Sequence, residues 1–151
     1  MPAVAEPPLR LLHVEDSADD VRIVELWLGR LGPQAVEVVQ APNLDAALGR
    51  LESEEFDVAV VDLSLPDSRA LATLHGVLPL AKALPLVVLT ASDDDELLRL
   101  AARAGVREFL VKGRTNALDF LIALVRSQPR RSRAFDSLLA RLLEQVRRGS
   151  P

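Results

Sequence analysis

Short apolar runs alternate with helix-period segments along most of this chain, and this alternation limits the folds that the chain can adopt. Five runs of five or six residues are rich in Val and Leu: 9–14, 35–40, 57–62, 86–90 and 107–111. Apolar runs of this length are typical of strands that are covered on both faces, as in a parallel sheet. Each run is followed by a segment with the apolar spacing of a helix, which makes five βα units. The sequence therefore predicts an α/β fold with a doubly wound, five-stranded parallel sheet.

The ends of the helices between these strands can also be predicted. The helices are expected at 19–31, 44–51, 69–78, 97–104 and 118–126. Asn43 is the expected N-cap of the second helix, and either Thr115 or Asn116 that of the fifth. The third helix is expected to be capped by Asp67 or Ser68.

The longest apolar stretch, 76–91, lacks the continuity of a membrane span. It is interrupted by Pro79, Lys82 and Pro85, and proline is unfavourable inside a helix. We therefore expect a helix end, a loop and a strand in this stretch.

Length and composition fit one compact domain. The chain has 151 residues, of which 49% are hydrophobic and 26% charged, as is usual for a globular protein. It has no cysteine, which excludes disulfides and thiol chemistry. Residues 1–8 lack the basic and apolar regions of a secretion signal. We expect them to form a flexible arm on a cytoplasmic protein, followed by a domain over 9–127 and a helical tail over 128–151.

The tail differs from the body in charge and has a strong amphipathic pattern. Residues 1–128 carry 12 basic and 20 acidic side chains, whereas 129–151 carry six arginines and two acids. Six apolar residues of the tail fall on one helical stripe: Phe135, Leu138, Leu139, Leu142, Leu143 and Val146. The pattern predicts a helix over 129–148 whose stripe needs a partner surface. A second copy of the chain is the partner that we favour. Folding back over the fourth and fifth helices, or beginning a longer signalling helix, are the alternatives.

Polar side chains stand where the predicted strands end. They are Glu15 and Asp16 after the first strand, Asp62 after the third, Thr90 after the fourth and Lys112 after the fifth. Lys112 is one of two lysines in a chain with sixteen arginines, so a compact ammonium is needed at this point. Because ligands bind outside the carboxyl ends of parallel strands, we expect these residues to form one site.

The combination of motifs resembles the receiver domain of two-component response regulators, which has a flavodoxin-like fold with sheet order 2-1-3-4-5. The resemblance covers approximately residues 9–127. It is carried by the acidic pair after the first strand, by Asp62, by Thr90-Ala91, and by the Phe-x-x-Lys motif from Phe109 to Lys112.

The resemblance implies that Asp62 is the phosphoacceptor and that Lys112 contacts the phosphoryl group. It also implies a metal site made by Glu15, Asp16, Asp62 and the backbone carbonyl of Ser64. Charge supports this independently, since like charges in a partly buried cleft are costly and one lysine does not neutralise three carboxylates. Oxygen ligands that leave room for waters suit Mg²⁺.

The resemblance further implies that Thr90 contacts the phosphoryl group and acts with Phe109 as a conformational switch. Ser64, Ala91 and Ser92 would line the phosphoryl pocket. The expected partners are a sensor histidine kinase or a histidine phosphotransfer protein, and a downstream protein target. We expect no direct contact with nucleic acid or membrane, because the residues after Ser127 are too few for a DNA-binding module, and so predict a stand-alone receiver. A homodimer could form through the tail or through the face made by the fourth helix, fifth strand and fifth helix.

Two other classes of function are consistent with parts of this pattern. An aspartyl-phosphate hydrolase would use the same Asp62, but it needs a second acid two residues later, where this chain has Ser64. A degenerate, receiver-like binding module, or a flavin-binding relative, is the other. His13 and His75 lack ligand or triad partners at useful spacing and are expected to be structural. Gly113 follows Lys112, where many receivers have proline, and this favours a trans bond.

Overall fold

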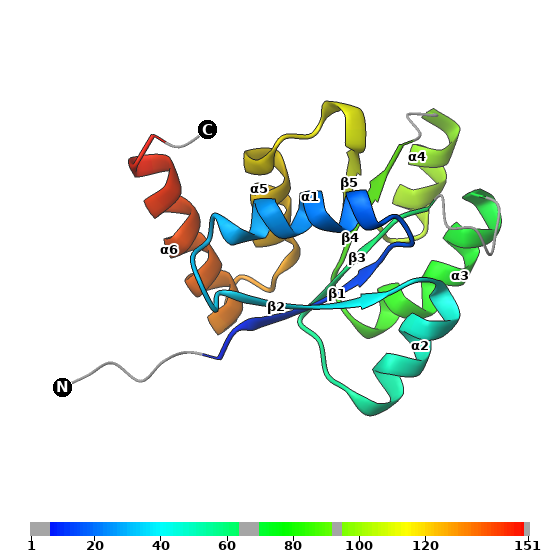
Figure 1. The fold of residues 1–151 in the computed structure, drawn as a ribbon. Coiled ribbons are helices and arrows are strands. Elements are labelled where there is room, and N and C mark those ends of the chain that lie inside the picture. Colours follow the sequence, from blue (N-terminus) through cyan, green and yellow to red (C-terminus); the bar gives the residue numbers. More distant parts are fainter. Residues whose placement is uncertain (1–6, 64–69, 92–94, 150–151) are drawn as a thin grey trace.

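The computed structural model describes residues 7–63, 70–91 and 95–149, except for the side chains of residues 70–74. A five-stranded sheet with the order β2-β1-β3-β4-β5 runs through its centre (Figure 1). The strands are β1 (Leu9–Val14), β2 (Val36–Ala41), β3 (Val58–Val61), β4 (Leu86–Thr90) and β5 (Glu108–Val111). All four pairings are parallel. The predicted doubly wound, flavodoxin-like sheet is confirmed.

Helices cover both faces of this sheet (Figure 1). They are α1 (Ala18–Gly29), α2 (Leu44–Ser53), α3 (Ala70–Ala83), α4 (Asp95–Arg103), α5 (Ala117–Ser127) and α6 (Arg133–Arg147). Successive side chains of a strand point to opposite faces. Accordingly, Leu11 of β1 packs in a core with α1 and α5, whereas Leu12 packs in a second core with α2, α3 and α4. The two cores hold the strand ends in fixed positions.

Side-chain caps fix the starts of several helices, as predicted for the second and the fifth. Asn43 accepts the backbone N–H of Ala46, and Asn116 accepts that of Asp119 in a capping box. Ser17 caps α1 by accepting the N–H of Asp20. The predicted caps Asp67 and Ser68 lie outside the described residues.

The third helix is longer than the sequence predicts. It was expected to end at residue 78, but α3 continues through Pro79 to Ala83. Val77 and Leu80 are almost completely buried, and Leu84 follows on the same face. Burial of such side chains contributes about 1.5–3 kcal/mol each, which offsets the hydrogen bond that Pro79 is unable to donate.

The C-terminal helix packs on its own domain. Leu138 and Leu142 join the core beneath α1 and α5 and are 2% and 7% exposed. Arg141 donates a hydrogen bond of 2.9 Å to the carbonyl of Leu31, beyond the end of α1. Gln128, between α5 and α6, donates to the carbonyl of Asp57 at 3.2 Å.

This arrangement is the fold-back alternative, on a surface that differs in part from the expected one. The helix lies beside α5 and the end of α1 (Figure 1) rather than over the fourth helix. The inner members of its stripe already have a partner surface within the chain, which leaves Leu143 and Val146 about half exposed, at 51% and 53%. The homodimer stays a prediction. The argument for it is weaker, because α6 buries the inner part of its apolar stripe within the chain. Within the described ranges, no helix has both the length and the apolar character needed to cross a membrane.

Candidate functional site

The carboxyl ends of β1 and β3 bring three acids together. Val14 pairs with Val61 in the sheet, so the residues that follow them, Glu15 and Asp62, emerge side by side. The Asp62 N–H donates to the carbonyl of Val14 at 3.1 Å, which continues the strand pairing by one residue. One carboxylate oxygen from each of Glu15, Asp16 and Asp62 lies within 4.8 Å of the others. The predicted convergence of these residues is therefore present.

The members of this cluster differ in exposure. Glu15 is 1% exposed and Asp62 4%, whereas Asp16 faces solvent. Glu15 is held by its backbone neighbours, because its Oε2 accepts the N–H groups of Asp16 at 3.2 Å and Ser17 at 3.3 Å. Its own carbonyl accepts Gln40 Nε2 at 2.9 Å. Two buried acids and one exposed acid thus form a cleft that is open to solvent on one side.

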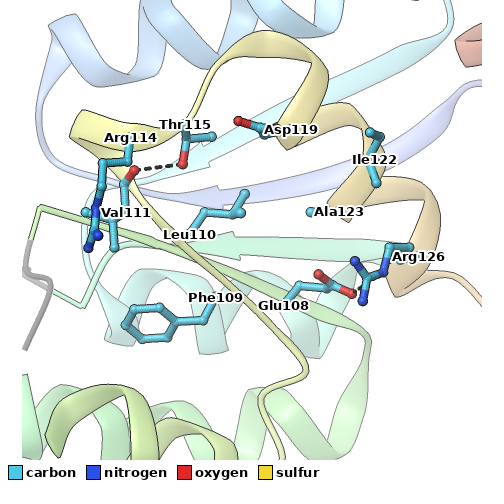
Figure 2. Close-up of a pocket in the computed structure, with 10 residues that line it drawn as sticks. All are labelled: Glu108, Phe109, Leu110, Val111, Arg114, Thr115, Asp119, Ile122, Ala123 and Arg126. Atoms are coloured by element: carbon cyan, nitrogen blue, oxygen red, sulfur yellow. Dashed lines mark hydrogen bonds and ion pairs between the residues drawn. The ribbon is translucent and has the colours of Figure 1, made fainter. Parts of the chain in front are cut away.

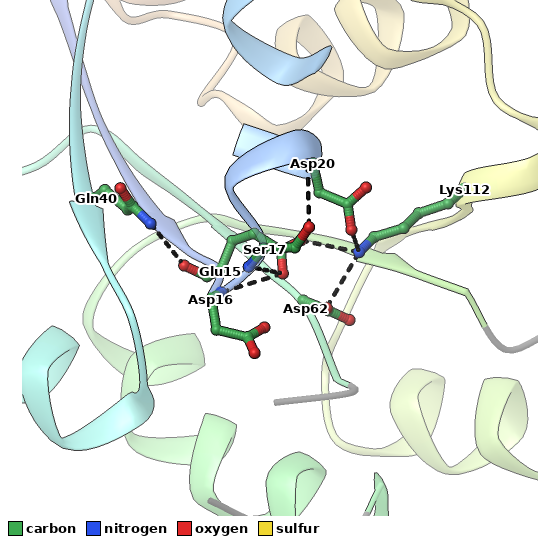
Figure 3. A network of polar contacts seen from close by, with 7 residues as sticks. All are labelled: Glu15, Asp16, Ser17, Asp20, Gln40, Asp62 and Lys112. Atoms are coloured by element: carbon green, nitrogen blue, oxygen red, sulfur yellow. Dashed lines mark hydrogen bonds and ion pairs between the residues drawn. The ribbon is translucent and has the colours of Figure 1, made fainter. Parts of the chain in front are cut away.

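Lys112 reaches into this cleft from the end of β5 (Figure 3). Its Nζ lies 2.6 Å from Asp20 Oδ2, 2.8 Å from Glu15 Oε1 and 3.1 Å from Asp62 Oδ2. Lys112 and the acids therefore meet at one site, as the sequence predicts, and three carboxylates share one ammonium.

Asp20 is a residue of the site that the sequence argument missed. It stands in the first turn of α1, one turn before Val24, which is buried. A signal was available, since positions 20, 24 and 28 follow the helical spacing of the inward face. An acid at the start of a buried stripe points toward the sheet edge rather than toward bulk water.

The charges of the cleft shift the pKa values of its groups. Burial raises the pKa of Glu15 to about 7, and the nearby charge of Asp62 raises it further against the opposing effect of Lys112. Burial lowers the pKa of Lys112, but hydrogen bonds to Asp20 and Glu15 and the charge of Asp62 outweigh it, so the pKa lies above its ordinary value. Lys112 is therefore a permanent cation, whereas Glu15 titrates near neutrality.

The donor set fits a small, hard divalent cation. Glu15, Asp16 and Asp62 offer only oxygen atoms, and the exposed Asp16 leaves space for waters, which is the pattern that Mg²⁺ prefers. With Asp20, four carboxylates face one ammonium, so the cleft carries an excess of negative charge. A cation bound at these three carboxylates would reduce that excess.

Thr90 and Ala91 stand on the other side of Asp62. Thr90 is completely buried at the end of β4 and pairs with Val111, the residue before Lys112. Ala91 is exposed. The remaining predicted pocket residues, Ser64 and Ser92, lie outside the described residues.

Phe109 lies on β5, opposite Val88 of β4. It is partly buried and packs against the core on the α2–α3–α4 side. Figure 2 shows its ring turned away from α5, while Leu110 points toward α5. A shallow pocket of about 390 Å³ lies between β5 and α5. Phe109 thus contacts both the core on the α2–α3–α4 side and the pocket beside β5, as a residue that links the two would.

The remaining sequence expectations concern His13, His75 and the bond after Lys112. His13 is 1% exposed, and burial lowers its pKa to about 4, so it is a neutral side chain below the cleft. His75 is exposed on α3. Neither histidine belongs to the carboxylate cluster. No cis peptide bond occurs among the described residues, so the bond between Lys112 and Gly113 is trans.

Comparison with known families identifies the domain. A model described as the response regulator receiver domain matches residues 11–123. The chain belongs to this family. A receiver is a phosphoacceptor signalling module of two-component systems rather than a conventional enzyme, so the hydrolase alternative is set aside.

Individual relatives agree with this assignment. The two-component response regulator PhoP of Pseudomonas aeruginosa is 33% identical over 106 residues, which are 69% of this chain and 45% of PhoP. The chemotaxis protein CheY-3 of Vibrio cholerae is 30% identical over 119 residues, 78% of this chain and 90% of that protein. The receiver spans less than half of PhoP, of the RssB protein of Serratia marcescens (41%) and of PilR of P. aeruginosa (22%).

Solved structures show the same fold. The chemotaxis response regulator CheY4 of V. cholerae superimposes with a TM-score of 0.65 at 25% identity, covering 80% of this chain and 98% of CheY4. The Mn²⁺-bound form of the response regulator Rcp1 superimposes with a TM-score of 0.63 at 25% identity, covering 77% and 89%.

Proposed function

We propose that Asp62 of this receiver accepts a phosphoryl group from a phosphohistidine of a sensor kinase or phosphotransfer protein, in a Mg²⁺-dependent reaction. The observation that carries this proposal is the position of Asp62, which shares a cluster with the two acids that follow β1 and lies 3.1 Å from the ammonium of Lys112. The receiver family supplies the expectation of a histidine kinase as donor.

The reaction needs a carboxylate nucleophile and stabilisation of charge on the phosphoryl oxygens. An Asp62 oxygen attacks phosphorus, the P–N bond to the donor imidazole breaks, and its electron pair stays on the imidazole nitrogen. An acyl phosphate on Asp62 results. Lys112 Nζ, 3.1 Å from Asp62 Oδ2, would pair with a phosphoryl oxygen, and the Thr90 hydroxyl at the neighbouring strand end would donate to another.

Glu15, Asp16 and Asp62, with the backbone carbonyl of Ser64, would hold the metal ion. When bound, the ion neutralises charge on the acids and on the transferring group. The similarity to Rcp1, for which a Mn²⁺-bound structure exists, supports a divalent cation in this position. We propose Mg²⁺ because the donor set is small, hard and open to water.

We further propose that the phosphorylated receiver signals through protein contacts on the face made by α4, β5 and α5. Thr90 and Phe109 would couple the phosphoryl group to this face, since both lie on paired strands that join the site to the β5 edge. Ile122 of α5 is an exposed apolar residue that lies beside β5 on this face.

The same proposal covers the organisation of the chain. We take 9–127 as the receiver, 1–8 as an arm and 128–151 as a tail, and propose a cytoplasmic, stand-alone receiver that contacts proteins rather than nucleic acid. Similarity to CheY-3 and CheY4 over 90% and 98% of their lengths supports this organisation.

A homodimer would use the α4–β5–α5 face, or Leu143 and Val146 of α6. Light scattering of the native chain and of Leu143→Glu, with and without phosphodonor, tests both interfaces.

Labelling with a small phosphodonor such as acetyl phosphate tests the phosphoacceptor. Wild-type protein should take up base-labile phosphate only with Mg²⁺, and Asp62→Asn should take up none. Asp57→Asn is a matched control, because Asp57 is exposed at the opposite end of the same strand. Labelling of Asp62→Asn, or labelling of wild type in excess chelator, would overturn the assignment.

A further inference from the structure

Asp20 is the acid of the cleft to which the proposed chemistry gives no task. Its Oδ2 lies 2.6 Å from Lys112 Nζ, the shortest of the three contacts of that ammonium (Figure 3). It is not one of the three carboxylates that converge as a metal cluster. Asp20 therefore acts on Lys112 rather than on a metal ion.

The three partners of Lys112 are not equivalent. An ammonium has three N–H donors, and the three carboxylates each accept one. Glu15 and Asp62 also belong to the metal cluster. A cation bound there would draw on their oxygens and repel the ammonium. Asp20 is the one contact of the three that a metal would leave intact.

The two residues also differ in how firmly they are held. Asp20 stands in the first turn of α1, and its N–H donates to Ser17 Oγ at 3.3 Å. The helix is anchored by Val24 and Leu28, which are 1% and 4% exposed. Lys112 begins a single 3₁₀ turn (Lys112–Arg114) and carries its charge on a flexible four-carbon stem. The fixed carboxylate thus restrains the mobile ammonium.

We propose that Asp20 is a positioning residue for Lys112, which it anchors on the α1 side of the cleft within reach of a phosphoryl group on Asp62. This inference rests on the proposed phosphorylation of Asp62 and adds a reason for the placement of the ammonium. Loss of Asp20 releases Lys112 when the metal occupies Glu15, Asp16 and Asp62.

The ammonium can be observed directly, without metal and without phosphodonor. The chain has two lysines, Lys82 and Lys112, so ¹⁵N-lysine labelling gives two side-chain signals, and Lys82 is the exposed reference. Asp20→Asn should shift the Lys112 signal and speed its hydrogen exchange with water. Asp19→Asn removes the same charge from an exposed neighbour and should leave the signal unchanged. An unchanged signal in Asp20→Asn, or equal changes in both variants, would overturn the proposal.

The second measurement is the rate of Mg²⁺-dependent phosphorylation in a double-mutant cycle. Asp20→Asn should lower the rate roughly tenfold or more, since small misplacements of a catalytic group have effects of this size. Asp19→Asn should stay within about twofold of wild type. In a Lys112→Ala background, Asp20→Asn should have no further effect, because it acts through Lys112.

A further loss in that background would mean that Asp20 acts independently, and the proposal would fail. Trp27 of α1, whose ring centroid lies 5.3 Å from that of Phe120, reports by fluorescence that each variant is folded. If wild-type protein takes up no phosphate, the proposed function fails, whereas the ammonium signal still decides the role of Asp20.

Discussion

The carboxyl and amino ends of the parallel strands, here called the carboxyl edge and the amino edge, shift the pKa of a glutamate in opposite directions. At the carboxyl edge, burial raises the pKa of Glu15 to about 7. Toward the amino edge, a hydrogen bond from Arg10, with help from Arg50, lowers the pKa of Glu54. Glu54 lies 2.9 Å from Arg10 and 3.0 Å from Arg50, and Arg10 also lies 3.3 Å from Glu37, so two cations serve two acids. At the carboxyl edge, one cation serves Glu15, Asp20 and Asp62.

This difference separates stability from function. The amino edge balances its charges, and two apolar residues of α6, Leu138 and Leu142, share a core cluster with Leu9 at the start of β1. The carboxyl edge keeps an excess of buried negative charge, which costs folding free energy. That excess is what a metal ion can relieve, so the receiver is destabilised where it is expected to react.

The largest expected effect tests the packing of α6 against the receiver core. Leu138→Ala should lower the free energy of unfolding by about 2–5 kcal/mol, because Leu138 is 2% exposed and its removal leaves a cavity. Chemical denaturation measures this, and Mg²⁺-dependent labelling of the folded variant should be retained. Leu143→Ala, at a position 51% exposed, is the control and should change the value by about 0.5 kcal/mol or less. Equal losses in both variants would mean that α6 is not docked as described.

The next prediction concerns the pH dependence that Glu15 imposes. Its pKa is higher in the folded state, so the folded protein binds more protons between about pH 4.5 and pH 7. Stability of the metal-free protein should therefore fall as pH rises through this window. Glu15→Gln should be more stable than wild type at pH 8, by about 1–3 kcal/mol, and equal to it near pH 4.

Glu54→Gln sharpens the comparison, since the shift at Glu54 has the opposite sign. Its lowered pKa means that ionised Glu54 stabilises the fold above its unfolded pKa and loses this contribution as pH falls. The variant should thus lose stability at pH 8 and match wild type in acid. Parallel pH profiles for the two variants would contradict the distinction between the edges.

A third prediction addresses metal binding. Asp16→Asn should weaken Mg²⁺ binding roughly tenfold or more, because it removes one of three charged ligands. Wild-type affinity should rise with pH up to about 7, as Glu15 loses its proton. Calorimetry or Trp27 fluorescence measures both. Asp45→Asn, an exposed acid in the first turn of α2, is the control. An unchanged affinity in Asp16→Asn would remove it from the metal site.

The smallest expected effect concerns the coupling between phosphorylation of Asp62 and the α4–β5–α5 face. Phe109→Ala should leave labelling of Asp62 intact but reduce the coupling between phosphorylation and partner or dimer affinity, by about 0.5–2 kcal/mol. The measurement is the ratio of affinities of phosphorylated and unphosphorylated protein. The same ratio in variant and wild type would show that Phe109 carries no coupling.

The sequence predicted the strands because they follow a local apolar pattern. It predicted the main site because ligands bind at the carboxyl ends of parallel strands. Apolar runs mark the strands, and parallel strands place Glu15, Asp62 and Lys112 at one edge. Asp20 was missed because functional groups were sought only where strands end, although the spacing of positions 20, 24 and 28 places it on the inward face of α1.

The end of the third helix and the docking side of the tail differ from the prediction because both depend on tertiary contacts. The helix through Pro79 is sustained by tertiary burial of Val77 and Leu80, which outweighs the local preference of proline. The stripe of the tail predicts a partner surface, but a second copy was the favoured partner, whereas the structure shows the fold-back alternative on α5. The side on which α6 docks is set by Gln128 and Arg141, whose hydrogen bonds reach distant backbone carbonyls.

The strand order also separates the groups of the site along the chain, and so in the order of their synthesis. Asp62 precedes Lys112 by 50 residues and Glu15 precedes it by 97. Since β1 and β3 are direct neighbours, a nascent chain that has reached β3 can bring Glu15 and Asp62 together long before their ammonium is synthesised. Until β5 has been made, these acids lack the ammonium that they share in the complete receiver.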